Sequence, residues 1–171
     1  MHIVADTFRP RAKVRIHHEI AYDYDDKRGL WVTKPVDEDQ VVDNIVTDAG
    51  LVRIHSYNYA TSRGSLGTGF NYIGLSDNAS APASGDTTLT GELAVSGLAR
   101  AQGTVTLPSL GGNQTTVYKL FTYLDVSAQG VQKSALFDAS SVGVMAHEVQ
   151  FAQRTLNTND TLAVTYTITI A

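Results

Sequence analysis

The sequence contains no cysteine and only four prolines. Without cysteine the chain can form no disulfide framework, no thiolate metal site and no thiol nucleophile. It also lacks any apolar run of about 18 residues, so it predicts no membrane-spanning helix. The net charge of −4 gives no general attraction to nucleic acid. We therefore expect neither a membrane nor a nucleic acid among the partners of this protein.

Charged side chains are concentrated in the first third of the chain. Residues 1–60 carry eight basic and ten acidic side chains, which together are 18 of the 30 in the whole sequence. Residues 61–171 hold the other 12 and are rich in Thr, Ser, Gly, Ala and Val. That composition is typical of a sheet protein with small polar outer faces. The sequence thus predicts a charged N-terminal region followed by a β-rich body.

The clearest periodic pattern lies close to the end of the chain. Between Thr161 and Ile170, apolar residues alternate with Ala and Thr, which predicts a half-buried strand with Leu162, Val164, Tyr166, Ile168 and Ile170 facing inward. Upstream, the apolar runs 131–137 and 144–151 flank an Asp-, Ser- and Gly-containing segment, 138–143. Two such runs around a short polar loop predict a β-hairpin.

The charged region begins with a second hairpin. From Lys13 to Tyr24 apolar and aromatic residues alternate with mainly charged ones, which predicts a long amphipathic strand. Residues 25–29 predict a turn and residues 30–33 the returning strand. Residues 1–11 show no periodicity, so we expect an extended basic arm ahead of the hairpin.

One short helix is predicted after the charged region. Thr47 is a suitable N-cap, and Asp48 lies where a carboxylate favours the positive end of the helix dipole. Leu51 and Ile54 then share one helical face. These features predict a helix from Asp48 to about Tyr57.

Strand and turn signals alternate through the rest of the chain. The sequence predicts a buried strand at 70–75, a long loop at 76–88, and strands at 97–107 and 115–126, the last with apolar residues on both faces. The expected fold is mainly β: an antiparallel β-sandwich or flattened barrel with one short helix and an extended N-terminal arm and hairpin. By composition, the arm and hairpin span residues 1–43 and the β-sandwich body spans residues 44–171.

The residue patterns that would indicate catalysis or metal binding are incomplete. His17 and His18 are adjacent on a predicted strand, so they face opposite sides and cannot chelate one ion together. His147-Glu148 begins like a zinc-protease helix motif, but Phe151 stands where the second histidine is required. The glycine-rich segment 63–69 has no lysine after its last glycine. We therefore expect no catalytic residues, no cofactor and no metal site.

An ordered series of short motifs resembles a family of small structural proteins of tailed bacteriophages, whose members are described as virion, tail-fibre-like or head-decoration proteins. The motifs span residues 44–171 and are Asn44 to Leu51, Tyr72 to Ser76, Ala81 to Thr87, Gly91 to Leu93, Ala135 to Ser141 and Asn159 to Ile170. The resemblance implies a component of the virion, assembled in the host cytoplasm, and not an enzyme. Residues 1–43 lie outside it.

Three functions stay open, two of them virion components and one from a different class. The one we favour is a capsid decoration (cement) protein that binds and stabilises the assembled head. A tail, collar or fibre subunit is the first alternative, and a carbohydrate-binding β-sandwich module is the second. The implied partners are the major capsid protein or neighbouring virion subunits. A homo-oligomer is also implied, with a trimer favoured because decoration proteins commonly occupy three-fold sites.

The basic arm is the predicted attachment site. Its candidate partner-binding residues are Phe8, Arg9, Arg11, Lys13 and Arg15. Arginines there would pair with carboxylates of a neighbouring subunit while the aromatic ring fills a pocket. The hypothesis is that this arm and the Lys13–Thr33 hairpin make the main contact with the capsid or with a neighbouring subunit.

Overall fold

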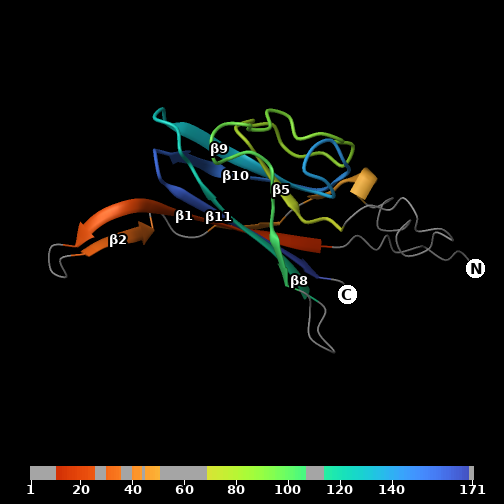
Figure 1. The fold of residues 1–171 in the computed structure, drawn as a ribbon. Helices are drawn as coiled ribbons and strands as arrows, with labels where there is room; N and C mark the ends of the chain where they lie inside the picture. The colour runs from red at the N-terminus through yellow and green to blue at the C-terminus, as the bar shows by residue number, and fades with distance from the viewer. Residues whose placement is uncertain are drawn as a thin grey trace, which may run out of the picture.

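The computed structural model describes residues 11–25, 30–35, 40–43, 45–50, 69–106 and 114–169; in the first two ranges, only the side chains of residues 13–17 are described. Its strands form two antiparallel sheets packed face to face (Figure 1). The fold is therefore a mainly β sandwich, which confirms the predicted class.

The first sheet has six strands and contains both ends of the described chain. Five follow the order β2-β1-β11-β8-β7, and β3 pairs with another part of β1. Their bounds are β1 Arg11–Asp25, β2 Leu30–Pro35, β3 Gln40–Asp43, β7 Thr104–Thr106, β8 Gln114–Thr122 and β11 Thr161–Thr169. The second sheet has five strands in the order β4-β10-β9-β5-β6. These are β4 Ile45–Val46, β5 Tyr72–Ser76, β6 Ala101–Gln102, β9 Gln129–Phe137 and β10 Met145–Leu156.

Strand β11 occupies the middle of the first sheet, as its pattern predicts. It pairs with β1 on one side and with β8 on the other along its whole length. Leu162, Val164 and Tyr166 are fully buried, and Ile168 packs against the core while staying half-buried near the strand end. The predicted hairpin is likewise confirmed, because β9 and β10 pair across the loop 138–143.

The charged N-terminal hairpin belongs to the same sheet as the body. Residues 11–15 of β1 pair with β11, from Arg11 opposite Thr169 to Arg15 opposite Thr165. Val14 and Ile16 are fully buried in the core, while Lys13 and Arg15 point to the other face and are exposed. Residues 11–15 are thus not part of a free arm, because their backbone is hydrogen-bonded within the sheet. The division at residue 43 was drawn from composition; of the strands before it, β1 pairs with β11, and β2 and β3 pair with β1.

The predicted N-cap is present. The Gly50 amide donates a hydrogen bond of 3.0 Å to Thr47 Oγ1, and the Thr47 hydroxyl donates to the Met145 carbonyl. Residues 48–50 are helical, and the rest of the predicted helix lies outside the described residues. A Cβ on Gly50 would lie 2.5 Å from Ala146 Cα, so only glycine allows this turn to sit against β10.

The predicted strand over 97–107 is wrong as a single element. Gly97 adopts a φ of +85° in a turn, and a Cβ there would strike the Thr122 carbonyl oxygen at 1.8 Å. The chain then forms β6 in the second sheet and β7 in the first, with Gly103 between them. A Cβ on Gly103 would lie 2.8 Å from Val117 Cγ1. The crossing between sheets therefore passes too close to β8 for a side chain, which a strand pattern does not reveal.

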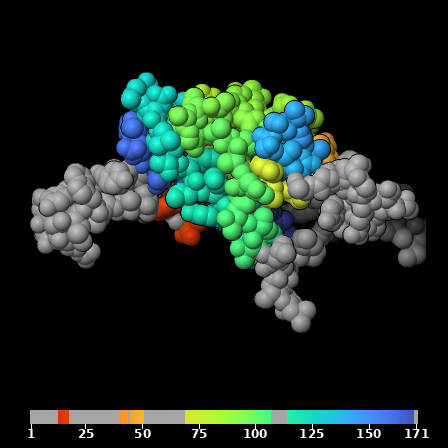
Figure 2. All heavy atoms as spheres, in the orientation of Figure 1, coloured from red at the N-terminus to blue at the C-terminus, as the bar shows by residue number. Residues whose placement is uncertain are grey.

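A long connection covers the outer face of the second sheet. Residues 77–100 fold over this face together with the loop 138–143, which Figure 2 shows as the green and light-blue atoms at the top of the molecule. Beneath them Leu89 packs with Ala135, Phe137 and Met145 in a small second core. Arg100 fastens the two loops, because it pairs with Glu92 at 2.6 Å, donates to the Val142 carbonyl at 2.7 Å and stacks on Phe137.

Replacing Leu162 by alanine should lower the free energy of unfolding by about 2–5 kcal/mol, because it opens a cavity at a fully buried position in the central strand. The control is Ala163→Ser on the opposite face of the same strand, which should change stability by less than about 0.5 kcal/mol. Urea titration followed by circular dichroism measures both variants. Equal losses would show that the strand faces are assigned the wrong way round.

Stability should fall as the pH is lowered from 6.5 to about 4. Burial lowers the pKa of His147 from 6.5 to about 4, so the unfolded chain takes up a proton in this range and the folded chain does not. This histidine alone then removes about 3 kcal/mol over that interval. The pH dependence of the urea midpoint should be shallower in His147→Gln than in the wild type. An identical slope in His147→Gln would contradict the assignment.

Candidate interaction surface

The outward surface of the six-stranded sheet forms a broad face, here called the open face. One row of side chains crosses five strands: Val41 of β3, Arg15 of β1, Thr165 of β11, Tyr118 of β8 and Thr104 of β7. The next row contains Asp43, Lys13, Thr167, Thr116 and Thr106. Since alternate residues of a strand share a face, these side chains lie opposite the core. The open face is therefore built from short polar side chains with charged residues at the β1 side.

Large apolar side chains also lie on this face. Val41, Tyr118 and Leu120 are 58%, 43% and 46% exposed. The described loops 77–100 and 138–143 pack over the other sheet, and the exposed fractions show that no described segment covers these three side chains. Leu124, which follows β8, is also exposed. Apolar residues next to a polar β surface are a common feature of protein interaction sites.

The basic residues of β1 border a hollow on the open face. Its volume is about 630 Å³, and Lys13 and Arg15 line it together with Asp43, Gln114, Thr167 and Thr169. Two cationic side chains face one carboxylate among these lining residues. Among these lining residues the hollow thus has one more positive than negative side chain, and it is here called the basic hollow. The hollow suits an acidic segment of a partner, because carboxylates would meet Lys13 and Arg15 while the threonine hydroxyls offer hydrogen bonds.

The structure places the predicted attachment residues in different situations. Lys13 and Arg15 lie together on the open face, which brings them to one hollow. The Arg11 backbone pairs with Thr169, but its side chain is outside the described residues. Phe8 and Arg9 also lie outside the described residues. Attachment through the arm therefore stays a prediction. For Lys13 and Arg15, the structure shows the surface on which such a contact would form.

Tyr118 and Leu120 were missed as surface residues because β8 carries apolar residues on both faces. That pattern predicts a strand buried on both sides. β8 does have a strand partner on each side, and Val117 and Phe121 are buried in the core. Its other face is nevertheless exposed at Tyr118 and Leu120. An apolar outward row on a strand is thus a signal either of burial or of a binding surface, and the sequence does not distinguish the two.

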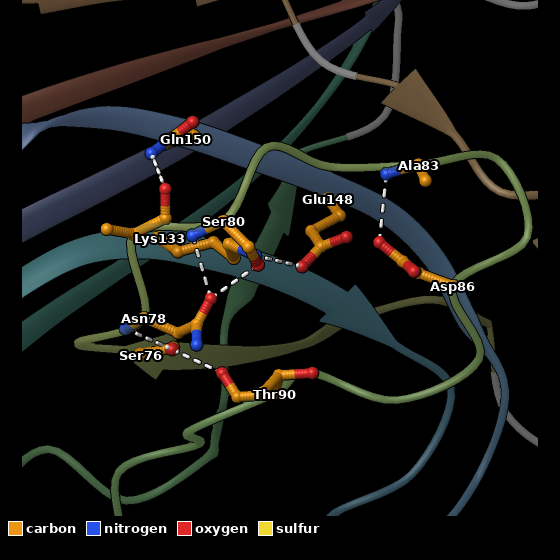
Figure 3. Close-up of polar contacts among 10 residues, drawn as sticks. Ser76, Asn78, Ser80, Ala83, Asp86, Thr90, Lys133, Glu148 and Gln150 are labelled. Atoms are coloured by element: carbon orange, nitrogen blue, oxygen red, sulfur yellow. Dashed lines mark hydrogen bonds and ion pairs between the residues drawn. The ribbon is translucent and has the colours of Figure 1, made fainter.

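A second candidate site is a buried charged cluster under the loop 77–91. Lys133 of β9 and Glu148 of β10 have side chains only 1% exposed, with Lys133 Nζ 3.1 Å from Glu148 Oε1. Lys133 Nζ also donates to Ser80 Oγ at 3.0 Å. Figure 3 shows Glu148 lying between Lys133 and Asp86 of the covering loop. A single lysine within the apolar run 131–137 was the signal in the sequence for this cluster.

The second oxygen of Glu148 needs a proton. Glu148 Oε2 is buried and meets no hydrogen-bond donor in the described part of the chain. Burial, and then a side-chain hydrogen bond with Asp86, raises the pKa of Glu148. The Ala83 amide, and then the hydrogen bond with Glu148, lowers the pKa of Asp86. Two facing carboxyl groups can be joined only by a shared proton, so we place that proton on Glu148.

The covering loop is attached to the sheet around this cluster by polar contacts. The side-chain amide of Gln150 donates to the Ala79 carbonyl at 2.6 Å, and Ser76 Oγ donates to the Thr90 carbonyl at 2.6 Å (Figure 3). Ser80 in turn bonds to Asn78. The Lys133 ammonium is therefore held in place from the loop side as well as from the sheet side.

Among the described residues, no group of three or more His, Asp or Glu side chains is arranged to hold a metal ion. Within the same residues, no helix has the length and apolar character needed to cross a membrane. No protein-family model matches the chain, and no curated protein matches its sequence.

Proposed function

We propose that this chain is a non-enzymatic structural component of a bacteriophage particle and, more narrowly, a capsid decoration (cement) protein that stabilises the assembled head. The main support for an attachment surface is the open face, where exposed apolar side chains adjoin the basic hollow of Lys13 and Arg15. The motif series over residues 44–171 supports the virion assignment by resemblance. A tail, collar or fibre subunit is the alternative.

The proposed contact combines two kinds of interaction. Tyr118 and Leu120 lose exposed apolar surface against the partner, which contributes affinity. Lys13 and Arg15 pair with carboxylates of the capsid protein or of a neighbouring subunit, which favours one orientation and speeds association. The arm residues Phe8, Arg9 and Arg11 would extend this contact. The covered sheet would then face away from the particle.

Co-sedimentation with phage heads tests the virion assignment. The protein should sediment with DNA-filled heads that lack tails, at a copy number comparable to that of the capsid subunits. A few copies per particle, lost with the tail, would support the tail, collar or fibre alternative instead. Absence from both heads and complete particles would refute the proposal. Mass spectrometry of purified particles gives the copy number.

Neutralising the basic hollow should weaken attachment to undecorated heads. The double variant Lys13→Gln/Arg15→Gln should bind about tenfold or more weakly at low salt, and the loss should shrink as salt rises. The control Ser140→Glu/Ser141→Glu changes the net charge equally but lies on an exposed loop of the other sheet. It should bind like the wild type. Equal binding by both variants would exclude the hollow as the attachment site.

A neutral substitution tests the apolar part of the open face. Tyr118→Ser should weaken head binding at all salt concentrations, because the loss is of buried apolar area and not of charge. Val142→Ser serves as its control, since Val142 is 89% exposed on the loop 138–143. Unchanged binding of Tyr118→Ser, with circular dichroism showing a folded protein, would remove β8 from the interface.

A further inference from the structure

The buried cluster of Lys133, Glu148 and Asp86 has the components of an amide-forming site. It holds an amine, a carboxyl group in contact with it and a second carboxyl group beside the first. An ordinary buried ion pair needs only the first two. Such a pair has no need of Asp86. It also has no need of a buried Glu148 Oε2 that meets no hydrogen-bond donor. We propose that Lys133 and Glu148 condense to an intramolecular isopeptide bond, with Asp86 as the group that accepts the released proton.

The two reacting side chains are held next to each other by the sheet. Lys133 lies opposite Gln150 and Glu148 lies opposite Ala135, so the two residues are diagonal neighbours on the same face of β9 and β10. The 3.1 Å between Nζ and Oε1 places the nitrogen at the edge of the carboxyl group. Fixed proximity of this kind raises effective concentrations to about 10⁵–10⁸ M in well-oriented intramolecular reactions.

The surroundings of the two side chains are dry and favour the uncharged form of the Glu148 carboxyl group. Both side chains are 1% exposed, and the adjacent small core of Leu89, Ala135 and Phe137 is apolar. Burial disfavours the charged form of Glu148, so it favours the carboxylic acid over the carboxylate. Exclusion of water also favours condensation over hydrolysis. The raised pKa of Glu148 is in keeping with this environment.

The bond changes balance without any further reactant. Lys133 Nζ, losing a proton, attacks Cδ of protonated Glu148, so that the N–C bond forms. The bond from Cδ to Oε2 then breaks, and Oε2 leaves as water with two protons. One proton stays on the amide nitrogen, and the last goes to the Asp86 carboxylate, which hydrogen-bonds to Glu148. Proton transfer by a positioned carboxylate is a typical contribution to such a step.

The mass of the intact protein under denaturing conditions tests the proposal. The wild-type chain should be lighter than its sequence mass by one water molecule. Lys133→Met and Glu148→Ala should each have the full mass of their sequences, whereas Lys13→Met, which alters an exposed lysine, should still lack one water. A wild-type protein of full sequence mass would overturn the proposal, and the wild-type measurement does not depend on how the variants fold.

Tryptic peptides locate the bond. Trypsin does not cleave after an acylated lysine, so residues 120–133 and 134–154 should appear as one peptide, 120–154, that lacks one water. A cross-link that instead joins this peptide to residues 64–100, which contain Asp86, would overturn the assignment of Glu148 as the acceptor. Asp86→Asn should leave most of the chain at full mass, because the amide cannot take up the proton. Complete cross-linking in Asp86→Asn would exclude its role.

Discussion

The hydroxyl of Tyr166 must find a hydrogen bond inside an otherwise apolar core, and this requirement joins the two sheets. Tyr166 is fully buried in the central strand β11, and its hydroxyl donates to Ser134 Oγ of β9 at 3.0 Å. Ser134 in turn donates to the Gly74 carbonyl of β5 at 3.0 Å. Leaving such a buried hydroxyl unpaired costs about 1–3 kcal/mol. The two consecutive hydrogen bonds therefore favour one position of β11 relative to β9 and β5. Burial accordingly raises the pKa of Tyr166.

The elements that could be predicted from sequence are those with strict alternation. The alternation over 162–168 predicted the inward face of β11, whereas Ile170 lies outside the described residues. The hairpin of β9 and β10 followed from two apolar runs around a polar loop. Thr47 was predicted as an N-cap from its side chain alone. The crossing at Gly103 was not predictable, because it depends on the closeness of β8, a contact between distant segments. Nor was the pairing of β1 with β11, which lie at opposite ends of the chain.

The two candidate sites also differ in how much of each could be predicted from the sequence. Lys13 and Arg15 were predictable as exposed cations, because they alternate with the buried Val14 and Ile16. Their joint hollow with β3 and β8 depends on strand order, which the sequence leaves undetermined. The cluster of Lys133, Glu148 and Asp86 combines two strands and a loop. A charged residue within an apolar run marked one member, but only the fold brings the partners together.

The two outer faces of the sandwich are treated in opposite ways. The five-stranded sheet is covered by the chain's own residues 77–100, and the cost of burying Lys133 and Glu148 is offset by contacts from Ser80 and Asp86. The six-stranded sheet keeps Tyr118, Leu120 and Val41 exposed beside its cations. One outer face is thus covered by a long loop of the same chain, whereas the other keeps apolar side chains exposed. The two faces of the sandwich are therefore not equivalent. That asymmetry is the structural basis of the proposal that the open face attaches to the partner and the covered sheet faces solvent.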